Sequence, residues 1–213
     1  MTEMLRLSDV HAHYGESHIL HGVNMHVNQG EVVTLLGRNG AGRTTTLKAI
    51  LGLVGKRTGS IKIKSQESVH LPPHQIARLG IGFCPEERGI FASLSCEENL
   101  LLPPKVAEGG GTRLSGGEQQ MLSVARILRT GAGLLLLDEI SEGLAPVIVQ
   151  ALGRAIRMLR EKGFTIVMVE QNFRFAAPLA DRFYVIEHGT VVEAFSATEL
   201  ESKSEMLKTY LGV

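Results

Sequence analysis

A glycine-rich segment between an apolar run and a helix-like stretch is the feature that most restricts how this chain can fold. Residues 37–45 read Gly-Arg-Asn-Gly-Ala-Gly-Arg-Thr-Thr, directly after EVVTLL at 31–36 and before the helix-like stretch 44–51. Glycines allow successive backbone N–H groups to converge on one point, and the helix that follows adds the positive end of its dipole. The segment therefore predicts a strand–loop–helix unit that cradles phosphate, the alternative being a glycine-rich turn without a ligand.

The loop fits the phosphate-binding pattern G-x-x-x-x-G-K-[ST], the P-loop, except that Arg43 stands where the pattern has lysine. Thr44 is placed to bind Mg²⁺ through its hydroxyl, and Thr45 is placed to touch phosphate. The candidate phosphate-binding residues are Gly37, Asn39, Gly40, Ala41, Gly42, Arg43, Thr44 and Thr45.

A second motif places two carboxylates after a continuous apolar run. The run Leu134–Leu137 is typical of a strand buried on both faces, and Asp138 and Glu139 follow it. Open α/β sheets bind their ligands at the carboxyl ends of their strands. Alone, the pattern is more often a solvated strand end. After a P-loop, it indicates Asp138 as a Mg²⁺ ligand and Glu139 as the general base that polarises the attacking water.

The chain as a whole predicts one α/β domain. Its 213 residues are 44% hydrophobic, enough for one core and too few for two large domains. Short β-type runs precede the glycine-rich loop, and strands then alternate with helices, so we expect a mostly parallel sheet flanked by helices, with an antiparallel layer from the N-terminus. Segment 60–64 is predicted as an edge strand, and Pro72-Pro73 as a break.

Composition and charge exclude several classes of function. Twenty-two basic and 22 acidic side chains give a formal charge of zero, so no overall basic field is available to hold nucleic acid. No run approaches the roughly 20 apolar residues that cross a bilayer. The N-terminus lacks the apolar stretch of a secretory signal, and two cysteines form no metal or disulfide framework. We therefore expect a cytoplasmic protein.

A third motif, LSGGEQQ at 114–120, lies before the carboxylate pair. Ser115 and Glu118 have the spacing of a capping box, so one interpretation is simply a helix start. Gly116 and Gly117 weaken a first helical turn, yet they expose backbone N–H groups to an approaching anion. Together with the two motifs above, this segment resembles the signature of the ATP-binding subunits of ATP-binding cassette (ABC) transporters.

The resemblance extends over essentially the whole chain and is closest to importers of branched-chain amino acids and of urea or amides. The segments behind this narrower match include HYGESHIL, LPPHQIARLGIGFCPEE, GLAPVIV and TIVMVEQN. It implies that residues 1–213 form a single ABC-type nucleotide-binding domain of the P-loop NTPase class. By the same resemblance Tyr14 stacks on adenine, Glu86 takes the Q-loop place near Mg²⁺, and Gln171 takes the place of the switch histidine.

The family's geometry also implies how subunits pair. Two subunits facing head-to-tail place Ser115, Gly116 and Gly117 of one over the γ-phosphate held by the other, so that the dimer buries two ATP molecules. The partner is either a second copy or a related ATPase subunit. The resemblance further implies transmembrane permease subunits, a periplasmic solute-binding protein that acts indirectly, and a position on the inner face of the cell membrane.

Two departures from the family pattern leave an alternative open. Arginine is longer, planar and forked where lysine is a compact point charge, so Arg43 is expected to permit ATP binding while weakening hydrolysis. Residues 100–113 are too few for the helical subdomain that related cassettes carry there, so either they are its shortened remnant or residues between them are missing from this sequence. The preferred function is an ATP-hydrolysing importer subunit; the alternative is a nucleotide-binding regulatory subunit impaired in hydrolysis.

Overall fold

The computed structural model describes residues 2–87, 96–97, 115–128 and 130–211. The strands are β1 (Glu3–Tyr14), β2 (Ser17–Asn28), β3 (Val32–Leu36), β4 (Lys56–Ile63), β5 (Gln66–Glu67), β6 (Ile81–Cys84), β7 (Leu134–Asp138), β8 (Thr165–Val169), β9 (Arg182–Glu187) and β10 (Thr190–Ser196). The helices are α1 (Arg43–Leu51), α2 (Pro73–Ala77), α4 (Gly116–Leu128), α5 (Pro146–Glu161), α6 (Phe173–Ala176), the 3₁₀ turn η2 (Ala197–Glu199) and α7 (Ser204–Leu211).

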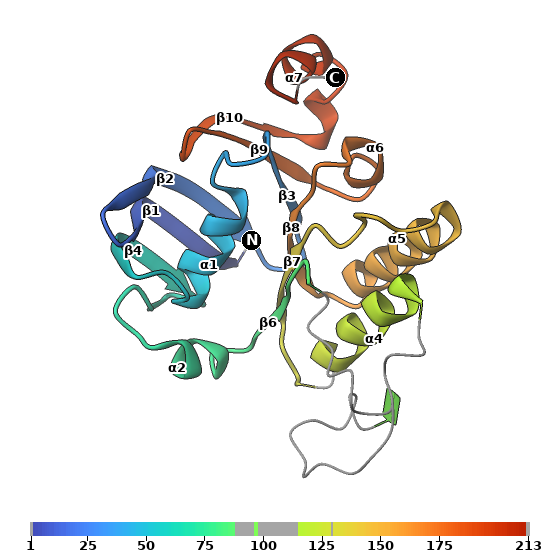
Figure 1. Ribbon diagram of the computed structural model, residues 1–213, viewed down its shortest axis with the longest axis horizontal. Coiled ribbons are helices and arrows are strands. Elements are labelled where there is room, and N and C mark those ends of the chain that lie inside the picture. The colour runs from blue at the N-terminus through green and yellow to red at the C-terminus, as the bar shows by residue number, and fades with distance from the viewer. Residues whose placement is uncertain (1, 88–95, 98–114, 129, 212–213) are drawn as a thin grey trace.

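The strands of the described residues form two sheets (Figure 1). The N-terminal sheet has the strand order β2-β1-β4-β5 and is antiparallel throughout. The second sheet has the order β10-β9-β3-β8-β7-β6, and every neighbouring pair except β10 with β9 is parallel. The predicted α/β fold, a mostly parallel sheet with an N-terminal antiparallel layer, is confirmed.

Within the described part of the chain, the core is divided among three apolar clusters. The largest lies between the two sheets and includes side chains of α1, such as Leu47 and Ile50. A second cluster joins the parallel sheet to α4, α5 and α6, with Leu135 and Ile156 among its members. The third packs α7 against β9 and β10 through Leu207 and its neighbours. Helix α1 therefore sits inside the molecule, whereas α4 and α5 cover the opposite face of the parallel sheet (Figure 1).

Helix α1 is anchored firmly at its C-terminal end. The Arg57 guanidinium, which comes from β4, donates hydrogen bonds to the carbonyl oxygens of Ala49, Ser68 and Leu71. Gly52 ends the helix in the left-handed conformation, with φ of 75°. These contacts hold the last turn of α1 against the antiparallel sheet.

One local prediction was wrong. Segment 60–64 was expected as an edge strand, but residues 60–63 belong to β4, which lies between β1 and the two-residue β5. The alternation of residues 60–64 does not specify the pairing with β5 that makes β4 an internal strand. At the predicted Pro72-Pro73 break the short helix α2 begins, because proline is compatible with the first helical position, where its missing N–H is not needed.

The register of the parallel sheet brings the ends of three strands together. Leu35 of β3 and Asp138 of β7 both pair with Val169 of β8. The segments that follow these strands therefore leave the sheet at the same edge, where open α/β sheets bind their ligands. Among the described residues, no helix has the length and apolar character required to cross a membrane. The shortened segment predicted at 100–113 lies outside the described residues.

Candidate functional site

The glycine-rich loop connects buried β3 to α1. All five residues of β3 are buried, and the chain turns at Gly37, whose φ is 150°. A Cβ atom at Gly37 would lie 2.3 Å from the carbonyl oxygen of Ile186, so no other residue fits without a shift of the backbone. The predicted strand–loop–helix unit is present, with α1 beginning at Arg43.

The N-terminus of α1 is open to a ligand. The N-cap of α1 is Gly42. Among the described residues, which include the whole of α1, no side chain caps this end, and the first turn contains no acidic residue. Backbone N–H groups of a first turn have no partner inside the helix, and they carry the positive end of the helix dipole. This end of α1 can therefore accept an anion.

A cavity of 430 Å³ lies over this helix end, and we call it the P-loop cavity. It is lined by Tyr14, Ile19, Asn39, Gly40, Ala41, Gly42, Arg43, Thr44, Thr45, Glu86, Glu139 and Glu142. The structure thus brings together most of the predicted nucleotide-binding residues, although the segments that carry them are far apart in the sequence. Tyr14, at the end of β1, is 40% exposed at the cavity wall.

Thr44 and Asp138 meet beside the P-loop cavity. The Thr44 hydroxyl donates a hydrogen bond of 3.0 Å to Asp138 Oδ1, and Asp138 is buried at the end of β7. Burial raises the pKa of Asp138; the Thr44 hydrogen bond opposes this rise, and the negative charge of Glu86 adds to it. A hydroxyl, a buried carboxylate and a second carboxylate nearby are the hard oxygen donors that Mg²⁺ prefers.

Arg43 is buried in the loop, with 4% of its side chain exposed. Its Nη2 donates to Asn39 Oδ1 at 3.1 Å and to Glu139 Oε1 at 2.8 Å. Its Nη1 is buried, and among the described residues it has no hydrogen-bond partner. A buried guanidinium nitrogen without an acceptor is costly, so this nitrogen fits a site completed by an anion such as phosphate.

Glu139 follows β7 in a backbone conformation that is rare for a residue with a side chain. Its φ is 45°, and its N–H donates to the Val169 carbonyl at 2.9 Å. Burial raises the pKa of Glu139 to about 7; the Glu142 carboxyl raises it further, while Arg43 opposes the rise. A carboxyl group with a pKa near neutrality suits a general base, because it accepts a proton readily at cellular pH.

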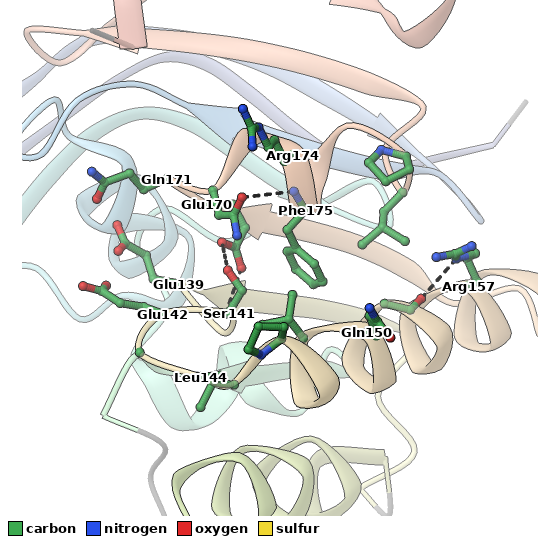
Figure 2. Close-up of a pocket in the computed structure, with 17 residues that line it drawn as sticks. Glu139, Ser141, Glu142, Leu144, Gln150, Arg157, Glu170, Gln171, Arg174 and Phe175 are labelled. Carbon is green, nitrogen blue, oxygen red and sulfur yellow. Dashed lines mark hydrogen bonds between the residues drawn. The ribbon is translucent and has the colours of Figure 1, made fainter. Parts of the chain in front are cut away.

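A second, larger cavity of 1010 Å³ adjoins the first and extends between α5 and α6. In the view of Figure 2, Glu139, Glu142 and Gln171 lie at one end of this cavity, and Gln150 and Arg157 lie at the other. Gln171 is exposed, and it also lines an 850 Å³ cavity together with Gly37 and Asn39. The predicted switch residue is therefore adjacent to both the loop and the carboxylate pair.

One residue of this region escaped the sequence analysis. Glu170 is 1% exposed, and it accepts hydrogen bonds from the N–H and the hydroxyl of Ser141. Burial raises the pKa of Glu170 to about 7, Ser141 opposes the rise, and the negative charge of Glu139 adds to it. The only available signal was the acidic residue that directly follows the apolar run TIVMV.

The signature segment lies apart from the P-loop cavity. Ser115, Gly116 and Gly117 are at the start of α4, and none of them lines that cavity. The Ser115 N–H and hydroxyl donate to Glu118 Oε2 at 2.8 and 2.7 Å, so the helix-start interpretation is confirmed. A separation of signature and P-loop within one subunit is what a head-to-tail pairing requires.

Gly117 has a packing role that the sequence analysis did not anticipate. A Cβ atom at this position would lie 2.5 Å from Cγ2 of Ile148, which belongs to α5.

We expect Gly117→Ala to lower the free energy of unfolding by about 1–3 kcal/mol, because overpacking forces α4 and α5 apart. Urea unfolding measures the change. Gly133→Ala is the control, since a Cβ there meets nothing within 4 Å; equal losses in the two variants would contradict the packing role.

Histidines on β1 and β2 form a stack of rings. The His13 and His18 rings are 4.1 Å apart and nearly parallel, and His18 also contacts His11 and His21. Among the described residues, no group of three or more histidine, cysteine, aspartate or glutamate side chains is arranged to hold a metal ion. The four rings come from the paired strands β1 and β2 and pack on one another.

Known proteins resemble the chain along its length. A family model described as "ABC transporter" matches residues 20–109. The high-affinity branched-chain amino acid transport ATP-binding protein BraG of Pseudomonas aeruginosa is 39% identical over 98% of this chain and 100% of its own. The lipopolysaccharide export system ATP-binding protein LptB of Escherichia coli strain K12 is 31% identical over 93% of each chain.

Solved structures share the fold. An ATP-binding cassette of an ABC transporter in its ADP conformation gives a TM-score of 0.87 over 100% of both chains, at 21% identity. A nucleotide-free ATP-binding cassette gives a TM-score of 0.83 over 99% of this chain and 96% of the other, also at 21% identity. At this level of identity the likeness concerns the fold alone.

Proposed function

Because the chain belongs to the ATP-binding subunits of ABC transporters and has their ABC-type ATPase domain, we propose that it hydrolyses MgATP to power import of branched-chain amino acids or related small solutes. The observation that carries the proposal is the P-loop cavity, where an uncapped helix end, a buried cation and two strand-end carboxylates meet. Each is suited to a different part of MgATP.

The triphosphate is proposed to lie on the loop. Backbone N–H groups of the loop, other than that of Ala41, which donates to the Arg38 carbonyl, would face the phosphates together with the open end of α1. Nη1 of Arg43, which has no partner among the described residues, would donate to one of their oxygens. Tyr14 offers an exposed ring to the adenine base. Thr44, Asp138 and Glu86 would hold Mg²⁺, which would neutralise charge on the phosphates.

Glu139 is proposed as the general base. Gln171 and Glu86 are proposed to lie beside it, near the water that attacks the γ-phosphate. The pKa of about 7 supports this role, since both protonation states are accessible at neutral pH. The hydrogen bond from Arg43 competes with it, because a carboxylate paired with a guanidinium is less available to a water proton. The same contact is the physical basis for the weakened hydrolysis expected of Arg43.

We propose that Ser115, Gly116 and Gly117 act across a head-to-tail dimer, on ATP held by a second copy or a related ATPase subunit. Their distance from the P-loop cavity of their own subunit supports this arrangement. Transmembrane permease subunits would anchor the dimer at the inner face of the membrane, and a periplasmic solute-binding protein would act on it indirectly.

Import is favoured over export by the higher sequence identity of the relative named for import. The relative named for branched-chain amino acid transport is 39% identical, whereas the relative named for lipopolysaccharide export is 31% identical. The first alignment spans 233 positions against the 213 residues of this chain, so that relative carries additional residues. We propose that they fall in the interval 100–113, the shortened remnant of the helical subdomain.

The decisive experiment is titration calorimetry of the purified chain with ATP and Mg²⁺, followed by size analysis and a measurement of phosphate release. Binding, ATP-dependent dimers and steady phosphate release are the expected results. Dimers without phosphate release would favour the hydrolysis-impaired alternative, and an absence of binding heat would overturn both functions. Uptake of labelled leucine by membranes that contain the chain with its permease subunits would then test the solute class.

Tyr14→Ala is expected to weaken ATP binding about tenfold or more, because a base stacked on an aromatic ring contributes roughly 1–3 kcal/mol. Titration calorimetry with ATP and Mg²⁺ measures the dissociation constant. Tyr14→Phe keeps the ring and removes only the hydroxyl, so its affinity should remain near that of the wild type. An unchanged affinity in Tyr14→Ala would remove Tyr14 from the base site.

A further inference from the structure

Glu170 is a buried carboxyl group that has no place among the proposed ATP and Mg²⁺ ligands. It follows directly after β8, on the strand between β3 and β7 at the centre of the parallel sheet. Only 1% of its surface is exposed, and it contributes to the wall of the cavity drawn in Figure 2. Burial of a carboxyl group is unfavourable unless its oxygens are hydrogen-bonded, so its partners indicate its purpose.

Both oxygens of Glu170 are used by one residue. Ser141 donates its N–H to Oε1 at 3.2 Å and its hydroxyl to Oε2 at 2.7 Å, and dashed lines join the two residues in Figure 2. Ser141 is itself 6% exposed, so water does not compete for these bonds. The carboxyl group therefore fixes the backbone of Ser141 as well as its side chain.

Ser141 lies two residues after Glu139, within the turn that presents the proposed base. The turn begins with an unfavourable backbone conformation, because Glu139 has φ of 45°, which residues with a Cβ seldom adopt. Such a conformation persists only where the surroundings hold it. On one side the Glu139 N–H is bonded to Val169, and on the other Ser141 is bonded to Glu170.

We propose that Glu170 is a positioning residue for ATP hydrolysis: through Ser141 it holds the turn 139–142 so that the Glu139 carboxyl faces the P-loop cavity. The inference rests on the proposed function, in which Glu139 is the general base. Glu170 does not touch the nucleotide or Mg²⁺ in this arrangement. It links the end of β8, next to Gln171, to the end of β7.

The test compares Glu170→Leu, Ser141→Ala and the double variant in the full chain. Leucine is similar in size to glutamate but has no hydrogen-bond acceptor, so the turn loses both of its bonds to residue 170. We expect kcat for phosphate release to fall about tenfold or more in each single variant, since small displacements of a catalytic group are costly. KM for ATP should change by less than about threefold, because the phosphate-binding loop is untouched.

The double variant distinguishes the proposed linkage from two separate effects. If both residues act through the same pair of hydrogen bonds, the double variant should be no slower than the slower single variant. Multiplied losses, or a kcat equal to that of the wild type in either single variant, would overturn the proposal.

Matched controls come from the antiparallel sheet. The carboxylate of Glu67 accepts hydrogen bonds from the N–H groups of Ile61, Ser68 and Val69, and the buried Ser68 hydroxyl donates to the Ile61 carbonyl. Glu67→Leu and Ser68→Ala make the same chemical changes at residues that do not line the P-loop cavity. Both controls should keep kcat within about twofold of wild type, even where they lower stability.

Hydrogen exchange separates this inference from the proposed function. In Glu170→Leu, backbone amides of residues 139–143 should exchange about tenfold faster or more, while those of α1 keep their wild-type rates. If the wild-type chain releases no phosphate, the proposed hydrolysis fails, and the exchange rates alone decide whether Glu170 holds the turn. Unchanged exchange in residues 139–143 would overturn the positioning role in either case.

Discussion

Glu139→Gln is expected to lower the rate of phosphate release by a factor of about 10²–10⁴, the usual contribution of a general base. The amide cannot accept a proton from water, although its oxygen can still accept the Arg43 hydrogen bond seen at 2.8 Å. The loop and the Thr44–Asp138 contact remain, so ATP affinity should stay within about threefold of wild type. Single-turnover phosphate release and titration calorimetry measure the two quantities.

Glu142→Gln is the matched control for this prediction. Glu142 is an exposed carboxylate that lines the same cavity three residues later. The same change of acid to amide should alter phosphate release far less there than at position 139. If Glu142→Gln abolishes release and Glu139→Gln does not, the base has been assigned to the wrong carboxylate.

Arg43→Lys is expected to raise kcat, by a factor of up to about 10²–10³ if the fork of Arg43 displaces a phosphate contact that lysine would supply. In the structure the guanidinium bonds Asn39 and Glu139, which occupies the proposed base. A lysine ammonium is a compact point charge on a thin stem, so it can approach phosphate without bonding Asn39 and Glu139 at the same time. Steady-state phosphate release over a range of ATP concentrations measures kcat.

Arg38→Lys provides the comparison, because Arg38 is an exposed arginine of the same loop segment. This exchange should leave kcat within about twofold of wild type. Equal turnover in the wild type and Arg43→Lys would reject the idea that Arg43 weakens hydrolysis.

The parts of the site that could be predicted from sequence depend on contiguous residues. The loop 37–45 carries its own geometry in its glycines, and the run Leu134–Leu137 announces a buried strand with Asp138 and Glu139 at its end. The meeting of Thr44 with Asp138 followed from the rule that ligands bind at the carboxyl ends of parallel strands. Local patterns and one topological rule were therefore sufficient for this half of the site.

The side-chain contacts that affect the pKa values and positions of Glu139 and Glu170 could not be predicted. Arg43 and Glu139 are 96 residues apart in the chain, and Ser141 and Glu170 are 29 apart. Each pair depends on strand register and on side-chain rotamers, which a single sequence does not specify. Gly117 was interpreted only through backbone exposure, because Ile148 could not be placed opposite it before α4 and α5 were packed.

The two ends of helix α1 are held differently, and this affects how nucleotide binding is transmitted to the rest of the molecule. Its last turn is tied to the antiparallel sheet by Arg57, whereas its first turn has no cap of its own. A bound phosphate would complete the helix from outside, in the way that a serine or aspartate side chain does in other helices. Phosphate binding in the loop would therefore stiffen α1, whose opposite end is already held against the antiparallel sheet.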